Sequence, residues 1–99
     1  MITVGKRIRL ARELAGLTQE RLAETMGVSR TAVSRWESGE IDPTIEHLVE
    51  LAQTLKVSSD FLLGIDGTDQ TMEVLMNMAS TLNKIVSEMH AEKTEKKEE

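Results

Sequence analysis

The sequence predicts an all-α protein in which a compact five-helix domain is followed by one C-terminal amphipathic helix. Apolar residues recur at intervals of three and four along most of the chain, and no stretch alternates with the period of two that marks a strand. Between these helical stretches stand Gly, Ser and Thr, which end and cap helices. We divide the chain into a domain at 1–64, a linker at 65–70, an amphipathic helix at 71–92 and a charged disordered tail at 93–99.

Three short helices are expected in the first forty residues. The first spans residues 4–15, before Gly16, and leaves Arg7 and Arg9 on a solvated face. The second follows Thr18 and ends before Gly27, and the third spans residues 29–38, with Ser29 as its cap. The inward stripe of the first helix is expected to comprise Ile8, Leu10, Ala11, Leu14 and Ala15.

Two further helices complete the domain. The fourth starts after Pro43-Thr44 and the fifth spans residues 59–63, before Gly64. Phe61 and Leu62 of the fifth helix join the core. The apolar residues of the fourth helix are Ile45, Leu48, Val49, Leu51, Ala52 and Leu55.

The composition argues against several classes of protein. The 99 residues include no cysteine, which excludes disulfides and thiolate metal sites and favours a reducing compartment such as the cytoplasm. No apolar run approaches the ~20 residues that cross a bilayer, so we expect no membrane association. His47 and His90 belong to no ligand cluster, and no serine has a histidine and acid partnership. We therefore expect no metal, no cofactor, no catalytic residues and no enzymatic activity.

Charge is distributed unevenly along the chain. The formal net charge is −5, which is unusual for a protein that binds nucleic acid. Residues 1–35, however, carry seven Lys and Arg against three Glu, whereas residues 65–99 carry four Lys against eight acidic residues. This asymmetry indicates one end that faces DNA and one end that faces something else.

Residues 18–37, TQERLAETMGVSRTAVSRWE, have the physical form of a helix-turn-helix. Gly27 permits the tight turn, and Val33 and Trp36 point inward from the helix that follows it. The outward positions of that helix hold residues that suit DNA, because arginine can donate two hydrogen bonds to guanine and threonine can contact a thymine methyl. Those positions are Arg30, Thr31, Ser34 and Arg35.

The stretches LTQERLAETMGVSRTAVSRWESGE, DPTIEHLVELAQTL and SSDFLLG resemble the lambda-repressor and Cro type of helix-turn-helix domain, the XRE family. The resemblance covers about residues 5–64 and implies a lambda-repressor-like fold that binds double-stranded DNA. It implies that Arg30, Thr31 and Arg35 contact bases.

The same resemblance implies contacts to the DNA backbone by Gln19, Ser34 and Ser38. Arg12 has two open interpretations, a phosphate contact or an internal ion pair with Glu37, and one guanidinium can serve both. The loop Glu40-Ile41-Asp42 is acidic where many members of the family carry Lys or Arg, so fewer counterions should be released on binding.

The C-terminal helix has the spacing of a heptad repeat and is expected to form a dimer interface. It could instead fold back over its own domain, and its methionine-rich face could also bind a different protein. The predicted seam follows intervals of three and four through Met72, Leu75, Ala79, Leu82, Val86 and Met89.

Together these features predict a cytoplasmic, nucleoid-associated regulator of transcription, most simply a dimeric repressor. Its recognition helix, residues 29–38, would enter successive major grooves of an inverted-repeat operator. Two alternatives remain open. One is an antitoxin-type autoregulator whose C-terminal helix binds a toxin, and the other is a protein-interaction module.

Overall fold

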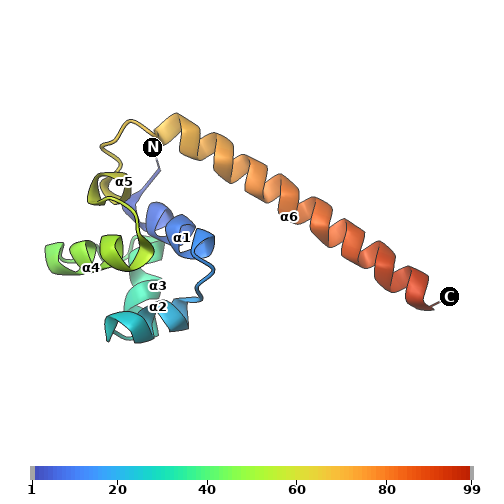
Figure 1. Ribbon diagram of the computed structural model, residues 1–99, viewed down its shortest axis with the longest axis horizontal. Helices are drawn as coiled ribbons and strands as arrows, with labels where there is room; N and C mark the ends of the chain where they lie inside the picture. The colour runs from blue at the N-terminus through green and yellow to red at the C-terminus, as the bar shows by residue number, and fades with distance from the viewer. Residues whose placement is uncertain (1, 99) are drawn as a thin grey trace. The chain divides into compact units, whose positions relative to one another are not determined.

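The computed structural model describes residues 2–98, and it describes the side chains of residues 2–90. The described part of the chain is helical and contains no strand, so the all-α fold class is confirmed (Figure 1). Residues up to Asp69 form one compact unit and residues from Gln70 onward form another. The helices are α1 (Val4–Leu14), α2 (Gln19–Met26), α3 (Arg30–Ser38), α4 (Ile45–Leu55), α5 (Ser59–Leu63) and α6 (Asp69–Glu98).

The first five helices share one kind of N-terminal cap. Each begins after a Ser or Thr in extended conformation, whose side-chain oxygen accepts a hydrogen bond from the third amide of the helix. Such a cap contributes about 0.5–2 kcal/mol relative to alanine, and it fixes where a short helix starts. The capping residues are Thr3, Thr18, Ser29, Thr44 and Ser58.

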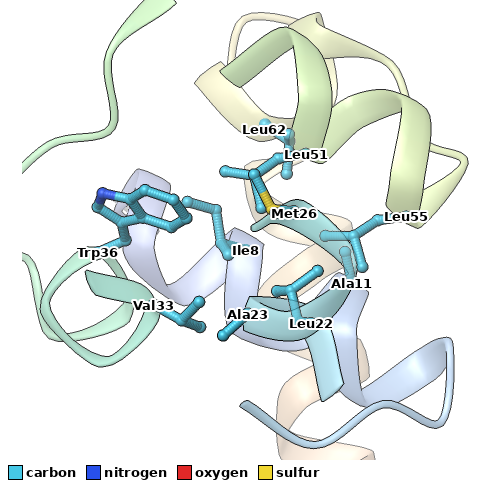
Figure 2. Close-up of a cluster of buried hydrophobic side chains, with 10 residues drawn as sticks. All are labelled: Ile8, Ala11, Leu22, Ala23, Met26, Val33, Trp36, Leu51, Leu55 and Leu62. Atoms are coloured by element: carbon cyan, nitrogen blue, oxygen red, sulfur yellow. The ribbon is translucent and has the colours of Figure 1, made fainter. Parts of the chain in front are cut away.

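The core of the first unit lies where α1 and α2 pack against α3, with α4 and α5 closing it. Figure 2 shows the ring of Trp36 directed into the same cluster as Ile8, as expected for the single tryptophan. The cluster comprises Ile8, Ala11, Leu22, Ala23, Met26, Val33, Trp36, Leu51, Leu55 and Leu62.

Part of the predicted apolar stripe is wrong. Leu14 is 76% exposed and Ile45 is 82% exposed, and Ala15 and Val49 are also exposed. Leu14 lies about 120° around α1 from Ile8 at 3.6 residues per turn, so the two side chains cannot face the same neighbour. The apolar faces of both helices are therefore narrower than the sequence pattern indicated.

Arg7 is buried, which corrects the expectation that it lies on a solvated face. Its Nη1 donates hydrogen bonds to the carbonyl oxygen of Phe61 at 2.9 Å and to Oγ1 of Thr68 at 2.9 Å. Its Nη2 donates to Asp69 Oδ1, and Asp66 Oδ1 lies 3.8 Å from Nη1. These partners compensate the burial of a charge, and they fasten the segment after α5 to α1.

Helix α6 differs in extent from the sequence prediction. It begins at Asp69 rather than at 71 and continues to Glu98, through most of the segment predicted as a disordered tail. Glu and Lys, which dominate this segment, have high intrinsic helix propensity. Residue 99 and the side chains of 91–98 lie outside the described residues.

Candidate nucleic-acid interface

Helices α2 and α3 are joined by a turn that has a left-handed glycine at its start. Gly27 has φ 68° and ψ 29°, a conformation that a residue with a Cβ resists. The amide of Val28 then donates to the carbonyl of Ala23 at 3.0 Å, and Ser29 Oγ accepts from the amide of Ala32 at 3.0 Å. These bonds satisfy the end of one helix and the start of the next, and so they fix the angle between α2 and α3.

Helix α3 has one buried face and one exposed face. Val33, Trp36 and Glu37 are buried against the rest of the first unit. The opposite face is exposed and bears four polar side chains, which line a shallow hollow together with Glu40. The four are the residues selected from the sequence, namely Arg30, Thr31, Ser34 and Arg35.

Each of the two exposed arginines of α3 has a carboxylate nearby. The distance from Arg30 Nε to Glu20 Oε1 is 4.0 Å, and the distance from Arg35 Nε to Glu40 Oε2 is 3.7 Å. All four side chains are well exposed, so these are loose surface pairs worth about 0–1 kcal/mol each. Both guanidinium groups therefore retain donors for an incoming ligand. Sequence reasoning did not foresee the Arg30 partner, because Glu20 lies on the preceding helix.

The buried face of α3 is held to α1 by an ion pair between Arg12 and Glu37. Arg12 Nε donates to Glu37 Oε2 at 2.7 Å, and Arg12 Nη2 donates to Glu37 Oε1 at 3.0 Å. Gln19 Nε2 donates to the same Oε1 at 3.1 Å, and Arg12 Nη1 donates to the carbonyl of Leu17 at 2.8 Å. The hydrogen bond to Glu37 raises the pKa of Arg12 above its usual value. Thus α1, the start of α2 and the end of α3 meet at one carboxylate.

Ser38 closes the end of α3. Its Oγ donates to the carbonyl of Arg35 at 3.1 Å and accepts from the amide of Glu40 at 3.3 Å. Ser34, one turn earlier, is exposed on the same face as the arginines. The structure thus groups Ser34 with Arg30 and Arg35, and it places Ser38 at the turn that leads into the acidic loop.

A second hollow adjoins α3 on the side of the loop that leads to α4. The rings of Trp36 and His47 lie 5.0 Å apart between centroids at an angle of 48°. This contact explains His47 as a packing residue of α4, and no group of His, Cys, Asp and Glu within the described residues could hold a metal ion. The lining also includes Thr31, Arg35, Ile41 and Asp42.

The predicted dimer residues all lie on α6, but they differ in exposure. Met72 is 3% exposed, whereas Leu75, Leu82, Val86 and Met89 are between 48% and 62% exposed. Ala79 is also exposed. Five of the six positions are therefore open to solvent in a single chain. No helix among residues 2–98 combines the length and the apolar character that a membrane span requires.

Comparisons with known proteins agree on the class of this domain. A family model described as Helix-turn-helix matches residues 8–62. The chain is 34% identical over 94 residues to the HTH-type transcriptional regulator ImmR of Bacillus subtilis (strain 168), which covers 94% of this chain and 72% of ImmR. It is 35% identical over 75 residues to the cryptic phage CTXphi transcriptional repressor RstR of Vibrio cholerae, which covers 76% of this chain and 67% of RstR.

A solved structure shares the fold as well as the sequence. The P22 c2 repressor protein, crystallised in complex with the synthetic operator 9T, matches with a TM-score of 0.63 and 38% identity. The match covers 67% of this chain and 100% of that chain. The lambda-repressor-like fold expected from the sequence is thereby confirmed.

Proposed function

Since the chain belongs to the helix-turn-helix family of DNA-binding transcriptional regulators, we propose that it is a repressor that binds an inverted-repeat operator as a homodimer. This family regulates transcription and is not enzymatic. The observation that carries the proposal is the exposed polar face of α3, whose opposite face is anchored in the core. A protein that binds DNA acts where the genome is, so we place it in the cytoplasm on the nucleoid.

In this proposal α3 enters the major groove and three of its side chains contact bases. Arg30 and Arg35 each present a guanidinium that can donate two hydrogen bonds to guanine O6 and N7. Thr31, which lies between them on the exposed face, can donate its hydroxyl or contact a thymine methyl. The two arginines are five residues apart, so they diverge around the helix and serve different base pairs.

Contacts to the DNA backbone orient the helix in the groove. Ser34 and Ser38 can bond phosphate from α3 and its end. Gln19 begins α2 and is only partly buried, so it can contact a phosphate while it also bonds Glu37. The side chain of Arg12 is 11% exposed and its donors are engaged by Glu37 and Leu17, so we propose that it acts mainly by positioning α3.

A homodimer would place two copies of α3 in successive major grooves, with centres roughly 34 Å apart. The pairing helix would be α6, whose seam is exposed at five of the six predicted positions. Binding at such an operator would block polymerase. Because few phosphate contacts are available beside the acidic loop at residues 40–42, dimerisation should supply much of the affinity.

Selection of bound sequences from a pool of random DNA duplexes tests this proposal. We expect an enriched inverted repeat with half-sites one helical turn apart, and affinity that falls steeply with salt. No binding to any duplex at low salt would overturn it and would favour the protein-interaction alternative.

Single substitutions then test the base contacts. Arg30→Ala and Arg35→Ala should each lower affinity for the selected operator by about 1–3 kcal/mol and relax the preference at one base pair. Arg21→Ala is the matched control, because Arg21 is an equally exposed arginine that pairs with Glu24 on α2 at 3.5 Å. Unchanged affinity and unchanged base preference in both α3 variants would remove these residues from the interface.

A further inference from the structure

Helix α6 carries a row of large apolar side chains that a single chain leaves in solvent. Leu75, Met78, Leu82, Ile85 and Met89 are between 45% and 59% exposed. Exposed apolar residues that form one contiguous stripe usually mark an interaction surface, whereas scattered ones need no explanation. The intervals between these five residues are three, four, three and four, which is the spacing of positions a and d in a heptad repeat.

The stripe differs from the seam predicted from the sequence. Both contain Leu75, Leu82 and Met89, but the predicted seam adds Met72, Ala79 and Val86. Ala79 provides little apolar area, so the positions that only the predicted seam contains add less to a dimer interface. Met78 and Ile85, which only the new stripe contains, are large apolar side chains and are exposed. At 3.6 residues per turn the five members of this stripe fall within about 80° of the helix circumference.

We propose that α6 pairs with α6 of a second copy of this chain, parallel and in register, through Leu75, Met78, Leu82, Ile85 and Met89. The proposal rests on the proposed function, because it specifies the homodimer that the operator model requires. The outward positions of this repeat are mostly polar, as a two-stranded coil needs. They include Asn77, Ser80, Asn83, Lys84 and Ser87.

A second copy fits this stripe because every position meets its own equivalent. In the parallel, in-register pair all five layers are apolar on both sides. An antiparallel pair matches position a with position d, which places Leu75 opposite Glu92 or Met89 opposite Thr71. Between residues 75 and 89 the only charged residues are Lys84 and Glu88, so two copies do not repel each other. The geometry therefore favours a parallel pair of identical helices.

The seam is short, and this sets its expected strength. Fifteen residues span only about 22 Å of helix, or roughly two heptads, which is marginal for an isolated coiled coil. We expect a reversible monomer–dimer equilibrium in which two adjacent half-sites on DNA increase the dimer fraction by mass action. Val74 and Val86 flank the stripe and add apolar area at its edges.

The absence of cysteine in the chain makes a direct test possible. Four single-cysteine variants of the full chain are oxidised mildly: Met78→Cys and Ile85→Cys in the proposed seam, and Ala79→Cys and Val86→Cys in the predicted one. We expect the first two to form disulfide-linked dimers at least about ten times faster, since only equivalent a or d positions approach to disulfide distance in a parallel coil. Ser80→Cys, on the outward face, sets the background rate.

Three outcomes would overturn the proposal. Faster linkage through residues 79 and 86 would show that the other seam is used. Linkage of Met78→Cys chains to Met89→Cys chains, with neither variant linking to itself, would show an antiparallel pair. No linkage above background, with a monomer by sedimentation at high concentration, would mean that α6 does not pair with a second copy of this chain.

Binding of the wild-type chain to a single half-site keeps this result separate from the proposed function. Half-site binding does not require pairing, so its persistence when linkage fails would leave DNA recognition standing and remove only the α6 pair. If the wild-type chain does not bind a half-site at all, the DNA-binding proposal is overturned, whatever the result of the disulfide experiment.

Discussion

Arg12 and Glu37 form a two-pronged ion pair, with Nε to Oε2 at 2.7 Å and Nη2 to Oε1 at 3.0 Å. The side chain of Arg12 is 11% exposed and that of Glu37 is 4% exposed. The pair joins the third turn of α1 to the last turn of α3, and Gln19 adds the start of α2. The orientation of α3 therefore depends on one buried carboxylate that accepts three hydrogen bonds.

Removal of the guanidinium from this pair should destabilise the folded protein. We expect Arg12→Ala to lower the free energy of unfolding by about 3–5 kcal/mol, because Glu37 is left buried without its counterion. Urea denaturation measures this loss. Arg9→Ala is the control, since Arg9 bonds Glu13 at 2.9 Å on the exposed face of α1 and should cost less than about 1 kcal/mol. Equal losses in the two variants would contradict the structural importance of the buried pair.

At Gly5 the backbone of α1 lies close to the backbone of α3. A Cβ at this position would lie 2.4 Å from the carbonyl oxygen of Trp36 and 2.6 Å from that of Glu37. Glycine to alanine inside a helix normally stabilises by about 0.5–1 kcal/mol, but here the backbone of α3 must move to accept the methyl group. We therefore expect Gly5→Ala to destabilise by about 1–3 kcal/mol in thermal or urea unfolding.

Gly16→Ala is a useful comparison for that variant. A Cβ at Gly16 would meet nothing within 4 Å, so any loss there comes from its φ of 74° alone. Because Gly5 lies beside the carbonyls that end α3, its variant should also weaken operator binding, whereas Gly16→Ala should not. A stable Gly5→Ala protein with unchanged unfolding would show that the two helices are less tightly packed than described.

Local signals in the sequence predicted the first five helices well, because caps and glycines act within a few residues. Thr18, Gly27 and Ser29 all have the roles expected of them. Burial of charge was not predictable in the same way. Arg7 is buried by partners 54 to 62 residues away in the chain, and no local pattern announces them. The exposed face of α3 was found because Val33 and Trp36 mark its buried side.

Substitution of Arg7 should loosen the segment after α5. Arg7→Met keeps an unbranched apolar stem but removes the donors to Phe61, Thr68 and Asp69. We expect faster amide hydrogen exchange at residues 65–69 and a loss of unfolding free energy of about 1–3 kcal/mol, because the carbonyl of Phe61 and the hydroxyl of Thr68 lose their donor while Asp66 and Asp69 remain partly hydrated. Amide hydrogen exchange in α2 should become faster only as much as the loss of global unfolding free energy requires. Unaltered exchange at residues 65–69 would contradict the proposed fastening of this segment.

Asp66 should make part of the stability sensitive to acid. Hydrogen bonds from Thr68 Oγ1 at 2.5 Å and from its amide at 3.2 Å, with Arg7 nearby, hold the pKa of Asp66 below its usual 3.8. Because the folded pKa is the lower one, this contribution is present above pH 3.8 and is lost as the pH falls through the folded value. We therefore expect the difference in free energy of unfolding between wild type and Asp66→Asn, measured by urea denaturation, to shrink as the pH is lowered below 3.8.

The acidic neighbours of the two proposed base-contacting arginines should weaken DNA binding. Glu40 Oε2 lies 3.7 Å from Arg35 Nε, on the exposed side of α3, where a phosphate backbone would approach in the proposed complex. Glu40→Gln removes a negative charge that repels phosphate and competes for Arg35, so we expect operator affinity to rise by about 0.3–1 kcal/mol at low salt. The gain should fade as salt increases, because both charges are exposed to solvent.

Glu24→Gln serves as the matched control for this prediction. Glu24 also pairs with an exposed arginine, Arg21, at 3.5 Å, but it lies in the last turn of α2 and is not among the residues that line the hollow with Arg30 and Arg35. Its substitution changes net charge by the same amount, so it reports the nonspecific effect of charge on DNA binding. Titration of both variants with operator duplex at two salt concentrations separates the local effect from the general one. If the two variants gain equally, Glu40 does not compete with DNA for Arg35, and the acidic loop acts only through its charge.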